Sequence, residues 1–157
     1  MLKEEFEAEI ESGALEVLLG DSEIKITLNE KVSFPSGSAR LQRNFKPVLA
    51  KVTKLLNSVE GRIVVAGHTD NVPIKTSAFP SNWELSAARA ASVVHLMSQS
   101  GLEDTKRLEI RAFADTIPLR DNNSAENRAL NRRVEIVIAG DDAGDPYADL
   151  RNPNEAN

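Results

Sequence analysis

The sequence predicts an α/β (α+β) domain, a two-layer sandwich in which a mixed β-sheet carries helices on one face. The chain has 157 residues, which is enough for one domain with a hydrophobic core and too few for two domains of typical size. Segments with the two-residue period of strands alternate with segments of helical period. Strands alternating with helices favour a two-layer domain with a mixed sheet.

The first third of the chain predicts a short helix, a hairpin and a loop. Residues 2–12 are acidic with an apolar residue at every fourth position, which indicates a helix with one narrow apolar stripe. Two apolar runs, 14–19 and 23–28, flank the turn-forming residues 20–22 and predict a hairpin. Residues 32–39 are expected to be an extended piece that leaves through a Pro/Gly/Ser loop, where backbone groups are free to meet a ligand.

The middle of the chain predicts two helices around one buried strand. Residues 41–56 have apolar positions at helical spacing, with Pro47 tolerable only near the helix start. The run 62–67 is β-branched and apolar on both faces, which is typical of a central strand buried on both sides. Ser81 and Glu84 match a capping box, so a helix is predicted from there to about residue 99.

The last third predicts two more strands and a tail. Residues 107–113 alternate as a strand, 124–131 indicate a short polar helix, and RRVEIVI (132–138) alternates as the closing strand. Residues 140–157 are acidic, poor in apolar residues and rich in turn formers, so we expect a mobile tail there.

Composition excludes several classes of protein. The formal charge of −5 argues against a nucleic-acid binder that neutralises phosphates. The chain has no cysteine, so it has no disulfides or thiolate metal sites. No run in the sequence approaches the roughly 20 apolar residues of a membrane span.

Asp70 and Arg89 are the charged residues whose positions need an explanation. The helical neighbours of Arg89 are apolar, so its guanidinium is expected at the edge of a buried stripe, where a charge needs a partner. Asp70 follows the buried strand 62–67, at the strand end where open α/β sheets bind ligands. Either the two residues pair as an internal clasp, or both face a cleft and divide a zwitterion, with Arg89 holding its carboxylate and Asp70 its ammonium.

An enzyme is the competing class. His68 and Asp70, with His95 or Asp115, are imaginable as metal ligands, but there are only two histidines and zinc hydrolases generally use three protein ligands. No GxSxG elbow is present. We therefore expect no catalytic residue, no metal and no cofactor.

Four motifs, in order FPSGSA (34–39), GHTDNVPI (67–74), SNWELSAARA (81–90) and NRALNRRVEI (127–136), resemble the OmpA-like peptidoglycan-binding domain of flagellar stator B subunits, the MotB and PomB type. The overall run of residues looks closest to the sodium-type PomB. The resemblance covers roughly residues 14–139 and implies a non-catalytic domain that anchors the motor stator to the cell wall. Its ligand would be the diaminopimelate of the peptidoglycan stem peptide, which carries a carboxylate and an ammonium group.

The resemblance also implies the site. Asp70 and Arg89 would be the main residues that grip the ligand, and Asn82, Leu85 and the backbone at Thr69 would line it. Either Arg132 or Arg133 would close the pocket, since consecutive strand residues point opposite ways, and we favour Arg132. The alternative is that both arginines are solvated or pair with Glu126 and Glu135.

The resemblance implies three parts: residues 1–13 as the end of a linker, packing as a helix; 14–139 as the peptidoglycan-binding domain; and the tail 140–157. It further implies a periplasmic location, a homodimer, and contact with the stator A subunit through a transmembrane segment that this chain lacks. No nucleic acid is expected as a partner. The alternative owner of such a domain is an OmpA-like lipoprotein or outer-membrane protein that staples the envelope.

Overall fold

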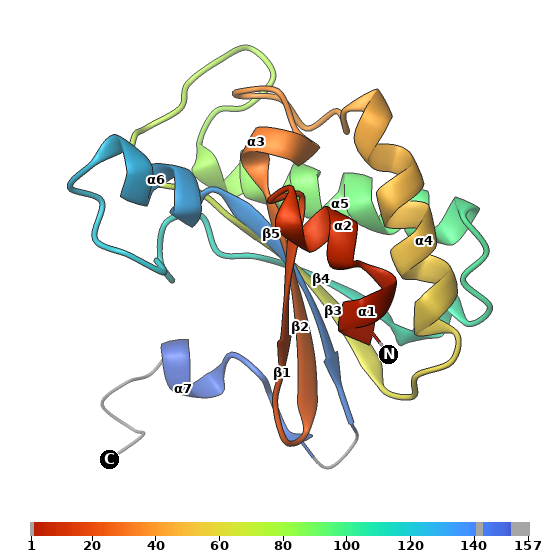
Figure 1. Ribbon diagram of the computed structural model, residues 1–157. Helices are drawn as coiled ribbons and strands as arrows, with labels where there is room; N and C mark the ends of the chain where they lie inside the picture. The colour runs from red at the N-terminus through yellow and green to blue at the C-terminus, as the bar shows by residue number, and fades with distance from the viewer. Residues whose placement is uncertain (1, 141–142, 152–157) are drawn as a thin grey trace.

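The computed structural model describes residues 2–140 and 143–151, and its centre is a five-stranded sheet (Figure 1). The strands are β1 (Leu15–Leu19), β2 (Glu23–Asn29), β3 (Arg62–His68), β4 (Leu108–Ala112) and β5 (Arg133–Ala139). They lie in the order β1-β2-β5-β3-β4. β3 and β4 are parallel and the other neighbours are antiparallel, which confirms the predicted mixed sheet.

The longer helices lie on one side of this sheet, as predicted (Figure 1). The helices are α1 (Leu2–Glu5), α2 (Glu7–Glu11), α3 (Glu30–Ser33), α4 (Lys46–Leu56), α5 (Asn82–Gln99), α6 (Ala125–Asn131) and α7 (Ala148–Arg151). Among the described residues, no helix is both long enough and apolar enough to span a membrane.

The core has two parts because strand residues alternate between the faces of the sheet. Ile63 and Val65 of β3 belong to the large cluster that contains the apolar residues of α4 and α5. Val64 and Ala66 face the other way, into a smaller cluster with Tyr147. The prediction that residues 62–67 form a strand buried on both faces is therefore confirmed.

Gly67 lets α5 lie close against the end of β3. A Cβ atom built at Gly67 would be 2.1 Å from the carbonyl oxygen of Ser86, a distance no side chain tolerates. The hydroxyl of Ser86 also accepts a hydrogen bond from the amide of Ala114, which follows β4. This close packing holds the first turns of α5 beside the ends of β3 and β4.

Three predicted elements differ in their limits. The helix predicted over 2–12 is two helices separated at Phe6, whose side chain is fully buried with the Lys51 ammonium 4.7 Å from its ring centre. The helix predicted from residue 41 begins at Lys46, because Pro47 has no amide hydrogen and fits only the first turn. The first two residues of the extended piece predicted over 32–39 belong instead to one helical turn, α3.

Part of the predicted mobile tail is attached to the domain, by Tyr147 and by an ion pair between Asp145 and Arg111. Tyr147 is 1% exposed, and its hydroxyl donates a 2.7 Å hydrogen bond to Glu135 on the side of the sheet away from α4 and α5. An acidic, polar composition gave no sign that a single aromatic residue would pack there. Residues 141–142 and 152–157 of this tail lie outside the described residues.

Candidate functional site

Asp70 lies just after β3, in a loop held by hydrogen bonds. The amide of Thr69 donates to Ala114 O at 2.8 Å, which ties this loop to the one after β4. Asp70 Oδ1 accepts from the amide of Val72 at 3.0 Å, and Asn82 Nδ2, in the first turn of α5, donates to Val72 O at 3.0 Å. The carboxylate of Asp70 is therefore held in a defined place, with the residue 6% exposed.

Arg89 projects from the second turn of α5 and is almost completely buried, at 2% exposure. Its Nη1 bonds Glu30 Oε2 at 2.6 Å, its Nε bonds Ser38 O at 2.8 Å, and its Nη2 bonds Pro35 O at 3.2 Å. Burial lowers the pKa of Arg89, and the adjacent Glu30 carboxylate opposes that effect. Arg89 thus fastens the loop 35–38 to α5.

Arg132 links the two carboxylates of the site. Its Nε bonds Glu30 Oε1 at 2.8 Å and its Nη1 bonds Asp70 Oδ2 at 2.7 Å. Arg133 points to the opposite face of the sheet, where it bonds Glu135 at 2.9 Å. Of the two arginines, Arg132 therefore faces Asp70, and the alternative pairing with Glu135 applies to Arg133.

The internal clasp between Asp70 and Arg89 is not formed, and both residues line the same cavity. They do not bond each other, and neither is an uncommitted charge: the ion pairs run Arg89–Glu30–Arg132–Asp70. Glu30 reaches this position because Asn29 at the end of β2 pairs with Arg133 of β5, which brings the amide of Glu30 to Arg132 O. We refer to these four side chains as the charge chain.

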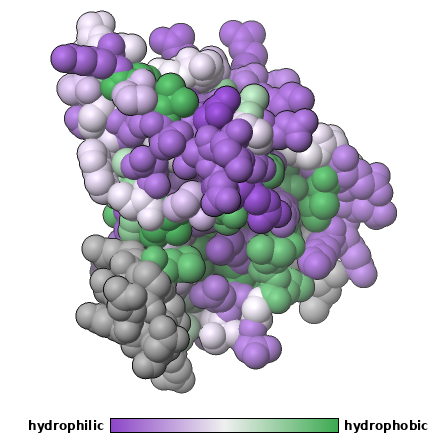
Figure 2. Space-filling model, turned by 90° about the vertical axis from the view of Figure 1, so that its left-hand side faces the viewer, coloured by the Kyte–Doolittle hydropathy of each residue, from purple (hydrophilic) through white to green (hydrophobic). Residues whose placement is uncertain are grey.

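The charge chain borders a cavity of about 430 Å³. All six residues predicted for the site line it: Thr69, Asp70, Asn82, Leu85, Arg89 and Arg132. The other lining residues are Glu30, Ser36, Gly37, Val72, Pro73, Ile74, Ala125 and Arg128. Figure 2 views the molecule from the side on which α6 lies, and hydrophilic residues dominate the upper half of that face, with apolar surface lower down at the level of the strands.

Sequence reasoning missed Glu30 and Arg128. Glu30 lies in the turn after β2, 59 positions before Arg89, and no local pattern links the two. Arg128 lies inside the NRALNRRVEI motif, four residues before Arg132.

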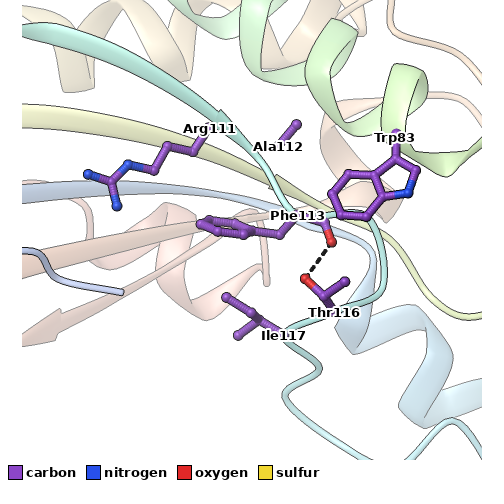
Figure 3. A pocket seen from close by; sticks show the side chains of 6 residues that line it. All are labelled: Trp83, Arg111, Ala112, Phe113, Thr116 and Ile117. Atoms are coloured by element: carbon purple, nitrogen blue, oxygen red, sulfur yellow. Dashed lines mark hydrogen bonds between the residues drawn. The ribbon is translucent and has the colours of Figure 1, made fainter. Parts of the chain in front are cut away.

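A second cavity of similar size lies on the other side of the first turn of α5 (Figure 3). Trp83 and Phe113 line it, together with Thr116, whose hydroxyl donates to Phe113 O at 2.7 Å. The Arg111 guanidinium points away from Trp83 in this view and pairs with Glu109 and Asp145 at 2.6 Å. This cavity offers no charge arrangement for a zwitterion.

His68 belongs to a buried polar cluster on the far face of the sheet. Its Nε2 lies 3.0 Å from Glu135 Oε1, which also accepts from Tyr147, and its ring stacks on Phe113. Burial lowers the pKa of His68 despite the neighbouring carboxylate. Within residues 2–140 and 143–151, no group of three or more His, Cys, Asp or Glu side chains is placed to hold a metal ion.

Comparison with known proteins gives both a matching family and similar members of known name. The model of the OmpA family matches residues 33–132. Motility protein B of Bacillus subtilis is 35% identical over 125 residues, which are 79% of this chain and 48% of that protein. The chain spans about half the length of the curated relatives it matches first.

Solved structures agree with the sequence comparisons. The cell wall anchor of the T6SS from Pseudomonas aeruginosa superposes with a TM-score of 0.83 at 36% identity, covering 89% of this chain and 97% of that one. A putative MotB-like protein from Desulfovibrio vulgaris gives 0.80 at 31% identity, covering 88% and 89%.

Proposed function

Because the chain belongs to the OmpA family, we propose that it is a non-catalytic peptidoglycan-binding domain that anchors a flagellar motor stator to the cell wall. The similarity to motility protein B and to a MotB-like structure supports the motor assignment. The observation that carries the proposal is the cavity itself, which the charge chain borders with side chains from four segments distant in sequence.

The proposed ligand is the diaminopimelate of the stem peptide, bound by its carboxylate and ammonium groups. Asp70 uses two acceptor positions internally, for Val72 and Arg132, and a carboxylate has about four, so an ammonium can be added there. A guanidinium has five N–H donors, and Arg89 uses three of them, which leaves one on each terminal nitrogen for a ligand carboxylate. Thr69, Asn82, Leu85 and Arg132 line the same cavity.

The mechanism is anchoring. A stator must not turn if it is to drive a rotor, and gripping the wall supplies the reaction force. We propose a periplasmic domain that works as a homodimer, attached to the inner membrane and to the stator A subunit through a segment outside this chain. Two sites on a polymer with repeated ligands gain effective concentration, which multiplies affinity by roughly 100 to 10,000. Similarity to the sodium-type PomB stays a prediction.

The division of the chain follows from the same proposal. Residues 14–139 would be the wall-binding domain, 1–13 the end of the linker and 140–157 the tail. Phe6 and Tyr147 show that both flanking segments contact the domain.

Sedimentation with purified peptidoglycan tests the binding proposal. Asp70→Asn keeps the acceptor for Val72 but removes the negative charge, so we expect the variant to remain in the supernatant. Asp115→Asn, at an exposed position outside the cavity, is the matched control and should sediment like the wild type. Thermal melts confirm that each variant is folded. A folded Asp70→Asn protein that sediments normally would show that the site is wrong.

The alternative is that the domain belongs to an OmpA-like envelope protein and not to a motor stator. The similarity to the T6SS cell wall anchor supports this alternative. An envelope-stapling protein would use the same cavity. Fractionation of cells that express the complete protein distinguishes the two, since a stator B subunit is expected in the inner membrane and an OmpA-like staple in the outer membrane.

A further inference from the structure

Three arginines line the cavity of the charge chain, and they differ in how far their donors are used. Arg89 bonds one carboxylate and two backbone carbonyls, and it is almost fully buried. Arg132 bonds two carboxylates. Their positive charges are therefore balanced inside the protein by Glu30 and Asp70.

Arg128, from the middle of α6, is different. The one hydrogen bond of its side chain in the described part of the chain is a 3.2 Å contact from Nη1 to the backbone carbonyl of Asn122. It forms no ion pair with a carboxylate among the described residues, and its side chain is only partly buried. Three cations and two anions thus line the cavity, which leaves one positive charge in excess on a protein whose net charge is −5.

We infer that Arg128 binds a second carboxylate of the ligand, so that the cavity selects a segment with two carboxylates and one ammonium group. This inference rests on the proposed function and names the ligand more closely. A zwitterion alone has no net charge and would leave the charge of Arg128 unmatched, whereas a ligand of charge −1 neutralises the whole cavity. A partly buried guanidinium with free N–H groups also presents the two-pronged donor geometry that fits a carboxylate.

A stem peptide offers such a group. When D-glutamate is joined to diaminopimelate through its γ-carboxyl group, its α-carboxylate stays free one residue away. Conversion of this α-carboxylate to an amide removes the charge and changes little else. The cavity is therefore expected to distinguish free from amidated stem peptides, and Arg128 is the residue that does so.

Calorimetric titration of the 157-residue protein tests this with two synthetic tripeptides, L-Ala-γ-D-Glu-meso-diaminopimelate and its α-amide. For the wild type, amidation should lower affinity about tenfold, the effect of one charge-assisted hydrogen-bonded pair. Arg128→Gln should bind both peptides with the lower affinity, and Arg128→Lys should keep part of the preference because it keeps the charge. Arg120→Gln, at an exposed arginine outside the cavity, should behave like the wild type.

The outcomes separate the two proposals. If the wild type binds both peptides equally, or if Arg128→Gln still prefers the free acid tenfold, the role of Arg128 is wrong while wall binding stands. If the wild type binds neither peptide and does not sediment with peptidoglycan, the proposed function itself fails and the inference with it. Thermal melts of both Arg128 variants exclude unfolding as the cause of a loss.

Discussion

Replacing Arg89 with alanine is expected to damage the fold before it damages binding. The side chain is 2% exposed and makes three hydrogen bonds, at 2.6, 2.8 and 3.2 Å. Its removal leaves two backbone carbonyls without this donor and takes from Glu30 one of its two arginine partners. Breaking a buried ion pair by removing one member costs about 3–5 kcal/mol. That is a large part of the roughly 5–15 kcal/mol by which a domain is stable.

Guanidinium unfolding followed by circular dichroism measures this loss. For a domain of this size, about 4 kcal/mol corresponds to a melting temperature lower by roughly 8–16 °C. Arg120→Ala, at an exposed position, should change stability by less than about 0.5 kcal/mol. The double variant Glu30→Ala, Arg89→Ala should lose less stability than the sum of the two single variants' losses, by about 1–3 kcal/mol, because the two residues are in contact.

A loss below about 1 kcal/mol for Arg89→Ala, or full additivity with Glu30→Ala, would refute this account of the charge chain. The expected result also limits binding studies. An Arg89→Ala protein that fails to bind peptidoglycan does not show that Arg89 touches the ligand, because the loop 35–38 has lost its attachment. Asp70→Asn and the Arg128 variants are therefore the better tests of the site.

Three further predictions concern the fold. Gly67→Ala should lower the free energy of unfolding by about 3 kcal/mol or more, because the new Cβ would overlap the carbonyl of Ser86. Gly140 has open space around it, so Gly140→Ala should change the same measurement little. Phe6→Ala should lower the free energy of unfolding by about 3–5 kcal/mol, as expected for a buried phenylalanine. Glu7→Ala, at an exposed position, should lower it much less. Equal losses would contradict docking of the N-terminal segment through Phe6. Because burial lowers the pKa of His68, the unfolded chain takes up a proton at pH values where the folded protein stays neutral, so the free energy of unfolding should fall as the pH drops below about 6.5. His68→Asn should flatten this slope between pH 7 and 5 and the exposed His95→Asn should not; an unchanged slope in His68→Asn would disprove the assignment.

The elements with a strong period could be predicted from the sequence. The helical spacing over 41–56 and from residue 81 to about 99, and the apolar run at 62–67, need no knowledge of the rest of the fold. The structure confirms these elements, with the first helix beginning later, at Lys46. The break at Phe6 was not predictable, because a four-residue spacing of apolar positions looks the same in one helix as in two short ones. Tyr147 was missed because a single buried aromatic residue in a polar segment leaves no periodic signal.

The sequence predicted six of the residues that line the cavity, but not their ion-pair partners. Asp70 follows from its place after a buried strand, and Arg89 from its spacing against the apolar stripe of α5. The partners of both residues depend on the order of strands in the sheet, which puts β2 beside β5 and thereby Glu30 beside Arg132. Hydrophobic periodicity gives each strand its two faces but does not state which strands become neighbours.

The charge chain also defines a path for mechanical load. Asp70 extends from the end of β3, Arg132 lies at the junction of α6 and β5, Glu30 begins α3, and Arg89 belongs to α5. If a ligand is held at Asp70 as proposed, tension on it would pass from the loop after β3 through these ion pairs to the start of β5, to α3 and to α5. If this site is the proposed attachment to peptidoglycan, sharing the strain among several parts of the core would make it stiff under sustained pulling, as a tether to a rigid polymer requires.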